Sequence, residues 1–136
     1  MTELLLQALR ILVVDDDRDS REMMTVALEE EGAVVLSVDS IQAAETAIEH
    51  WQPDILISDI RMPDGNGYEL IRSIRAKSES LTKAVDPLPA IALTAFSGVE
   101  ERQASLSAGF QKHLTKPVDL NELYLAIAAL AKRSPV

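Results

Sequence analysis

The stretch Pro53–Met62, PDILISDIRM, decides the fold that the rest of the chain follows. Three successive aliphatic residues, Ile55 to Ile57, are typical of a strand that is buried on both faces, and such strands belong to parallel α/β sheets. Asp59 follows at the carboxyl end of this strand, which is the edge where parallel sheets bind ligands. Asp59 is therefore a candidate for chemistry, although a single Asp after a strand is also a common way to begin a turn.

The composition describes one domain of ordinary size. The chain has 136 residues, 47% of them hydrophobic, without an apolar run long enough to span a membrane or a secretory signal at the N-terminus. We therefore expect a cytoplasmic protein with no membrane partner. The absence of Cys excludes disulfides and thiolate metal sites, and two His residues are too few for a histidine metal cage. A net charge of -9 disfavours direct nucleic-acid binding and suits a divalent cation.

Four further short segments predict strands, and three of these run into polar residues. Ile11–Val14 is followed by Asp15, Asp16 and Asp17, Ala90–Leu93 by Thr94, and Gln111–Thr115 by Lys116, whereas Ala33–Val38 completes the set. A purely structural explanation exists for part of this pattern, because Asp17 or Asp19 can cap the helix that follows. Capping does not explain Asp15 and Asp16, which are still attached to the strand.

Helical spacing of apolar residues predicts a helix after each strand. The helices are expected over Ser20–Glu31, after Ser40 as N-cap, from Tyr68 after a tight glycine loop, from a capping box at Ser97 to Ala108, and after Asp119 as N-cap. The weak apolar stripe of the fourth helix makes it a candidate mobile element. Lys77–Pro89 is expected to be a surface loop. Five alternating strands and helices predict an α/β fold, a doubly wound five-stranded parallel sheet with five helices.

In that fold the strands deliver their last residues to one edge, so residues distant in sequence meet. We expect Asp15, Asp16, Asp59, Thr94 and Lys116 to converge there. Crowded carboxylates raise one another's pKa unless a cation screens them, and Mg²⁺ prefers oxygen ligands. A Lys charge and a Thr hydroxyl suit phosphate. The set is therefore suited to phosphoryl transfer onto a carboxylate.

Four segments carry a resemblance to a known family. ILVVDDD (11–17), LISDIRMPDGNGYEL (56–70), IALTAF (91–96) and LTKP (114–117) match, in order and spacing, the signature regions of response regulator receiver domains. The chain thus resembles the CheY-like family. The resemblance implies a flavodoxin-like sheet of order 2-1-3-4-5, the order established for CheY itself. It implies a receiver domain over residues 11–133, with 1–10 as an N-terminal extension or linker and 134–136 as a tail.

The resemblance also implies the chemistry of the site. Asp59 would be the phosphoacceptor, which receives the phosphoryl group from phosphohistidine. Asp16, Asp59 and the main-chain carbonyl of Arg61 would bind Mg²⁺ directly, and Asp15 would bind it through water. The peptide between Lys116 and its following proline is expected to be cis. The chain would be a signalling domain rather than an enzyme, with only self-catalysed phosphorylation and dephosphorylation.

Further roles follow by the same resemblance. Lys116 would pair with the phosphoryl oxygens, and Thr94 would turn inward to hydrogen-bond them. The switch position, where the family carries Tyr or Phe, is His113 here, which puts the usual aromatic description in doubt. Arg61 and Phe96 occupy the two positions that tune the lifetime of the phosphorylated form, and a large ring at Phe96 with Arg61 is expected to lengthen it.

The partners implied are a sensor histidine kinase or a histidine phosphotransfer protein, and a downstream effector protein or output domain. A homodimer through the fourth helix, fifth strand and fifth helix is also implied.

Two rival functions stay open. A haloacid-dehalogenase-like phosphatase would use Asp15-x-Asp17, but Asp19 stands where a small residue is expected, and no cap domain fits the length. A receiver that only binds other proteins is the second rival, against which the full set of acids, Thr94 and Lys116 argue.

Overall fold

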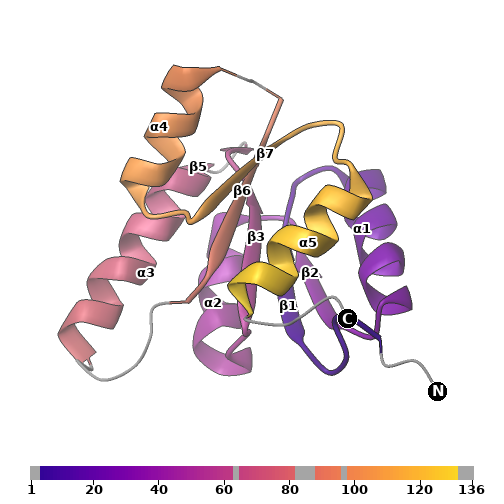
Figure 1. The fold of residues 1–136 in the computed structure, drawn as a ribbon. Helices are drawn as coiled ribbons and strands as arrows, with labels where there is room; N and C mark the ends of the chain where they lie inside the picture. Colours follow the sequence, from indigo (N-terminus) through magenta and orange to yellow (C-terminus); the bar gives the residue numbers. More distant parts are fainter. Residues whose placement is uncertain (1–3, 63–64, 82–87, 96–97, 132–136) are drawn as a thin grey trace.

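The computed structural model describes residues 4–62, 65–81, 88–95 and 98–131. Its centre is a parallel sheet of order β2-β1-β3-β6-β7 (Figure 1). The strands of this sheet are β1 (Arg10–Val14), β2 (Val34–Val38), β3 (Ile55–Asp59), β6 (Ala90–Thr94) and β7 (Lys112–Thr115). Two short strands, β4 (Arg61–Met62) and β5 (Gly65–Asn66), form a separate antiparallel pair after β3. Counting only the strands of the main sheet, the order is 2-1-3-4-5, as predicted.

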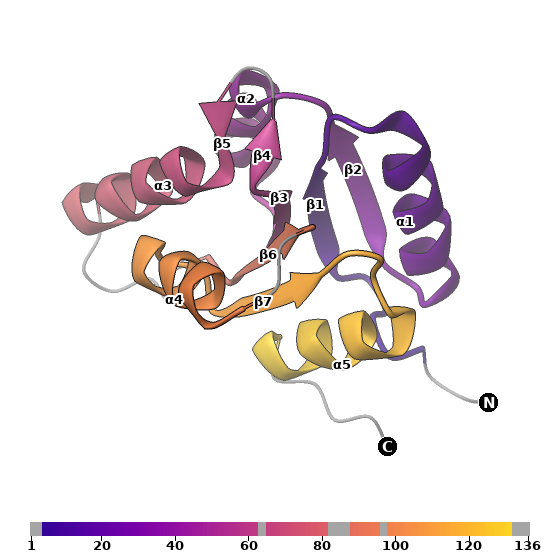
Figure 2. The ribbon, with the colours of Figure 1, turned by 90° about the horizontal axis from the view of Figure 1, so that it is seen from above.

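Helices cover both faces of the sheet, which confirms the predicted doubly wound α/β fold. They are α1 (Arg18–Glu30), α2 (Ile41–Trp51), α3 (Gly67–Leu81), α4 (Val99–Ala108) and α5 (Leu120–Leu130). α1 and α5 pack on one face, and α2, α3 and α4 pack on the other (Figure 2). Each face has its own cluster of buried aliphatic side chains. No helix in the described part of the chain is long and apolar enough to cross a bilayer.

Polar side chains begin three of the helices, as the sequence predicts. The carboxylates of Asp17 and Asp119 and the hydroxyl of Ser40 each accept a hydrogen bond from a backbone N–H in the first helical turn. The predicted capping box at Ser97 stays a prediction. α4 begins after Gly98, which has φ 136° and makes no side-chain cap. A left-handed backbone favours glycine, so the chain enters α4 through its backbone conformation. Ser97 itself lies outside the described residues.

One expectation is corrected by the structure. The predicted loop over Lys77–Pro89 is wrong in its first residues, because α3 continues to Leu81. No Gly or Pro interrupts the sequence there, so nothing in it stops the helix. At the N-terminus, residues 5–8 form a hydrogen-bonded turn, and Leu6 and Leu9 are buried in the core beneath α1. This segment packs on the sheet, whereas the predicted domain boundary at residue 10 stays a prediction.

Candidate functional site

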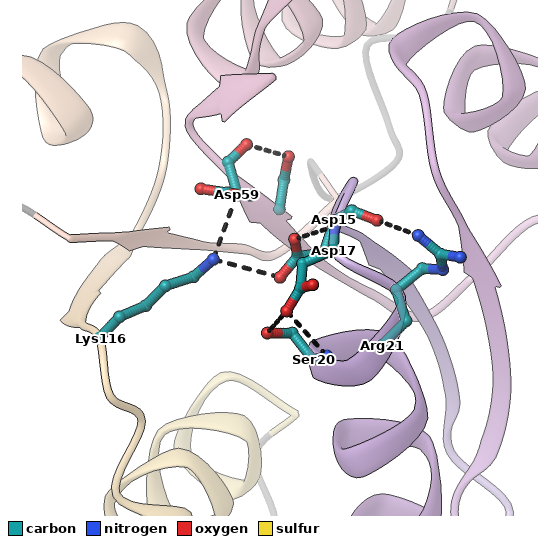
Figure 3. Close-up of polar contacts among 7 residues, drawn as sticks. Asp15, Asp17, Ser20, Arg21, Asp59 and Lys116 are labelled. Atoms are coloured by element: carbon teal, nitrogen blue, oxygen red, sulfur yellow. Dashed lines mark hydrogen bonds and ion pairs between the residues drawn. The ribbon is translucent and has the colours of Figure 1, made fainter. Parts of the chain in front are cut away.

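Asp15, Asp59 and Lys116 meet at the carboxyl edge of the sheet, each from a different strand. The Lys116 Nζ donates to Asp15 Oδ2 at 3.2 Å and to Asp59 Oδ2 at 3.1 Å (Figure 3). The side chain of Asp15 is fully buried, that of Asp59 is 11% exposed and that of Lys116 is 25% exposed. One ammonium group therefore bridges two nearly buried carboxylates, and one side of Asp59 still faces solvent.

Asp15 is fixed by its own loop. Its Oδ1 accepts the backbone N–H of Asp17 at 2.9 Å, and its carbonyl accepts a hydrogen bond from Arg21 at 2.8 Å. Asp17 turns away to accept both the N–H and the hydroxyl of Ser20, and these hydrogen bonds lower the pKa of Asp17 (Figure 3). Asp17 thus serves the start of α1, and Asp15 serves the site. This division explains two of the four clustered acids separately.

The loop after β3 returns to the backbone of Asp59. The Gly67 N–H donates to the Ile60 carbonyl at 2.8 Å. A Cβ at Gly67 would stand 2.7 Å from the carbonyl oxygen of Asp59, a distance that real Cβ atoms do not adopt. Glycine at this position therefore lets the loop close tightly behind the acid. Ser58 adds a hydrogen bond from its hydroxyl to the same carbonyl at 2.9 Å.

The charges of the site act on one another. Burial, which penalises the ionised carboxylate, raises the pKa of Asp59, and Asp15 adds to this while Lys116 opposes it. For Lys116, burial alone would lower the pKa, but the charges of Asp15 and Asp59 outweigh it and raise the pKa. The lysine is thus held in its charged form, and its charge only partly offsets the effect of burial on the pKa of Asp59.

Three carboxylates could hold a metal ion. One oxygen each of Asp15, Asp16 and Asp59 lie within 4.8 Å of one another, with Asp16 exposed at the mouth of the group. An all-oxygen donor set with several negative charges fits Mg²⁺. Arg61 lies two residues after Asp59, in β4, with its side chain exposed. The structure therefore brings together the acids that the sequence predicted.

Thr94 and His113 lie on neighbouring strands. Thr94 ends β6 and is 1% exposed, and its carbonyl accepts the Lys116 N–H at 2.7 Å. His113 lies in β7 opposite Ala92, and its ring contacts α4, where the Nδ1 is 2.9 Å from Ser105 Oγ. The predicted switch pair is thus divided between the site edge and the α4 face. Phe96, the other predicted lifetime residue, lies outside the described residues.

Sequence reasoning missed two residues around His113. Ser105 of α4 is fully buried, and the Tyr68 hydroxyl of α3 donates to Glu101 at 3.1 Å. The sequence places Tyr68 at the start of a helix without indicating the contacts of its hydroxyl, and nothing in it marks Ser105 for burial. The only signal was indirect, because a helix without an apolar stripe needs other contacts to hold it in place.

Comparison with known proteins gives one consistent result. The family model described as the response regulator receiver domain matches residues 11–128. An uncharacterized 14.6 kDa protein in the sodA1 3' region of Leptolyngbya boryana is 46% identical over 113 residues, covering 83% of this chain and 82% of that protein. The response regulator MprA of Mycobacterium ulcerans is 40% identical over 128 residues, which cover 93% of this chain and 52% of MprA. The chain thus spans about half the length of that relative.

A solved structure agrees. The receiver domain of Francisella response regulator 1452 superposes with a TM-score of 0.81 at 26% identity, covering 90% of this chain and 96% of that one. The fold, the order of its strands and the matched family model all point the same way. The chain therefore belongs to the response regulator receiver domain family of two-component signalling systems.

Proposed function

We propose that this receiver domain accepts a phosphoryl group on Asp59 from the phosphohistidine of a sensor kinase or a phosphotransfer protein. The observation that carries the proposal is the placement of Asp59 at the end of the buried central strand, 3.1 Å from Lys116 and beside two further acids. Asp15 is fully buried and Asp16 is exposed, whereas Asp59 combines a solvent-facing side with a preformed cationic partner.

The transfer is a substitution at phosphorus. An Oδ atom of Asp59 forms the new P–O bond while the P–N bond of phosphohistidine breaks and the imidazole leaves. Lys116 turns from Asp59 to the incoming phosphoryl oxygens, where its charge offsets the charge that Asp59 gains. Asp15 keeps Lys116 near the pocket during this exchange, because it holds the same ammonium group at 3.2 Å.

Asp15, Asp16 and Asp59, with the main-chain carbonyl of Arg61, would hold Mg²⁺. When bound, the ion would neutralise charge between the phosphoryl oxygens and the acids. The closeness of the three carboxylates supports this assignment, since the contact of Asp59 with Lys116 does not fully offset the burial of its charge.

The switch is proposed to run through Thr94 and His113 to a partner-binding face. Thr94 would turn its hydroxyl to the phosphoryl group, and His113 would respond on the neighbouring strand. α4, β7 and α5 would then change their affinity for an effector, an output domain or a second copy of the chain. Arg61 and Phe96 are proposed to slow hydrolysis by limiting the approach of water.

Incubation with acetyl phosphate and Mg²⁺, followed by intact mass measurement, tests the proposal. We expect about one phosphoryl group per wild-type chain and none on Asp59→Asn, which is nearly isosteric. Asp39→Asn is the matched control, because it removes an exposed acid just after β2 and should label like the wild type. A wild type that releases phosphate but never carries a label would indicate a phosphatase instead, and a wild type that neither carries a label nor releases phosphate would also contradict the proposal.

A further inference from the structure

Apolar packing holds α4 weakly. Its buried residues are Ser105 and Ala108, and two of its large apolar side chains, Val99 and Leu106, are 70% and 45% exposed. The N-cap Gly98 makes no side-chain hydrogen bond. A helix with so little buried apolar surface depends on its polar contacts for its position.

Those contacts form one connected group, the Ser105 network, which consists of Tyr68, Glu101, Ser105 and His113. The Ser105 Oγ lies 2.9 Å from His113 Nδ1, 3.5 Å from the Tyr68 hydroxyl and 3.1 Å from the Glu101 carbonyl. Tyr68 also donates to the Glu101 carboxylate at 3.1 Å. The network thus joins α3, α4 and β7 at a single buried hydroxyl.

The surroundings of the His113 ring favour one of its tautomers. The Ser105 hydroxyl has one proton, which goes either to the Glu101 carbonyl or to His113 Nδ1. In the first arrangement the oxygen of Ser105 accepts from His113, which places the ring proton on Nδ1. The Nε2 of His113 is buried without a hydrogen-bond partner among the described residues. As an acceptor it loses less by this than an unpaired N–H would, which favours the same tautomer.

We propose that Ser105 is the positioning residue of His113, and that their hydrogen bond transmits a change at the phosphorylation site from β7 to α4. The coupling rests on the proposed function, because it requires Asp59 to change state. His113 lies in β7 three residues before Lys116, and Ser105 is the buried anchor of α4. If the His113 ring moves, either its hydrogen bond to Ser105 breaks or α4 moves with the ring.

The far end of α4 is held separately. The Arg75 guanidinium donates to the Gly109 carbonyl from Nη2 at 2.7 Å and from Nε at 3.2 Å, and Phe110 is buried directly after it. With the C-terminal end fixed to α3, displacement of α4 is expected to concentrate in its N-terminal turns. Those turns carry Glu101, which belongs to the Ser105 network.

The first experiment tests the hydrogen bond without phosphorylation. Long-range ¹H–¹⁵N spectra at about pH 8, above the ordinary imidazole pKa of about 6.5, report which nitrogen of each ring carries the proton. The chain has two His residues, and the exposed His50 serves as an internal reference. We expect the Nδ1–H form for His113. In Ser105→Ala the ratio of Nδ1–H to Nε2–H should fall roughly 2- to 12-fold, the factor for one hydrogen bond. The exposed Ser107→Ala should leave it unchanged.

The second experiment tests the coupling. Amide chemical shifts of α4 are compared before and after labelling with acetyl phosphate and Mg²⁺. We expect α4 to respond in the wild type and in Ser107→Ala but not in Ser105→Ala, while β7 responds in all three. A tautomer ratio of His113 that is unchanged in Ser105→Ala, or an equal α4 response in that variant, would overturn this inference and leave phosphorylation intact. An unlabelled wild type would instead overturn the proposed function and the coupling together.

Discussion

Asp59 is an acid whose surroundings work against its own charge. Burial is the largest influence and raises its pKa, and the favourable contact with Lys116 does not fully offset it. An acid with a raised pKa in the folded state costs stability once the pH exceeds that pKa, because the folded state must then give up a proton that it holds more tightly than the unfolded chain does. Added positive charge beside Asp59 should therefore stabilise the folded state.

The first prediction follows from this sign. In metal-free buffer at neutral pH, Asp59→Asn should melt at a higher temperature than the wild type. The difference should shrink as the pH falls through the folded-state pKa of Asp59 towards its ordinary value of about 3.9, since protonation removes the same cost. Thermal unfolding across this pH range measures it, with Asp39→Asn as the control for a lost surface charge. A destabilised Asp59→Asn at neutral pH would show that the lysine contact outweighs burial.

Residue type and strand position made part of the site predictable. Asp15, Asp59 and Lys116 each stand at the carboxyl end of a short predicted strand, so a parallel sheet must bring them to one edge. The role of Ser105 could not be predicted, because a serine within a polar helix gives no sign of burial until the packing of α4 on α3 and β7 is known. The tautomer of His113 likewise depends on that contact.

Among the elements, the N-terminal turn contributes to the core. Leu6 is fully buried with Leu28 of α1, and the Leu6 N–H donates to the Glu31 carbonyl at 3.0 Å. Leu6→Ala should lower the free energy of unfolding by about 2–5 kcal/mol, the range for a buried Leu truncated to Ala. Urea unfolding measures this, and Leu4→Ala, at a position 43% exposed, should cost less than about 1 kcal/mol. Equal losses would mean that the turn does not belong to the folded unit.

Arg75 joins three segments around the end of α4. Besides Gly109, it donates to the Leu88 carbonyl at 2.6 Å and to Gln111 Oε1 at 3.1 Å, and burial lowers its pKa. Arg75→Met keeps the apolar stem but leaves these acceptors unpaired, so it should cost about 1–3 kcal/mol. Arg72→Met removes an exposed arginine one turn away and is the control. If both variants unfold at the same urea concentration, Arg75 does not hold this junction.

The elements also show where local signals suffice. Asp17, Ser40 and Asp119 mark helix starts because a short polar side chain satisfies free backbone N–H groups there. α4 departs from that rule, since its entry depends on the positive φ of Gly98, which sequence spacing does not reveal. The end of α3 is not predictable in this way, because the polar residues from Lys77 to Leu81 are typical of a loop and yet continue the helix.

In the whole molecule, folding of the sheet brings the three acids together. A cation bound to them should therefore stabilise the folded chain as a unit. The unfolded chain does not gather Asp15, Asp16 and Asp59, so Mg²⁺ should raise the melting temperature, by the equivalent of about 2.7 kcal/mol at one hundred times its Kd. Asp16→Asn removes an exposed ligand and should weaken this response with little effect on the metal-free protein. Asp39→Asn should respond like the wild type. A response that survives unchanged in Asp16→Asn would place the ion elsewhere.

The measurement that tests the central claim most directly is the chemical location of the phosphoryl group. Borohydride reduces an aspartyl phosphate to homoserine, so treatment of the phosphorylated protein followed by peptide mass spectrometry marks the acceptor residue itself. We predict homoserine at position 59 in the wild type, and its absence from Asp59→Asn and from wild type that was never phosphorylated. Homoserine at Asp15 or Asp16 in place of Asp59 would contradict the assignment, because it would make one of the proposed metal ligands the acceptor.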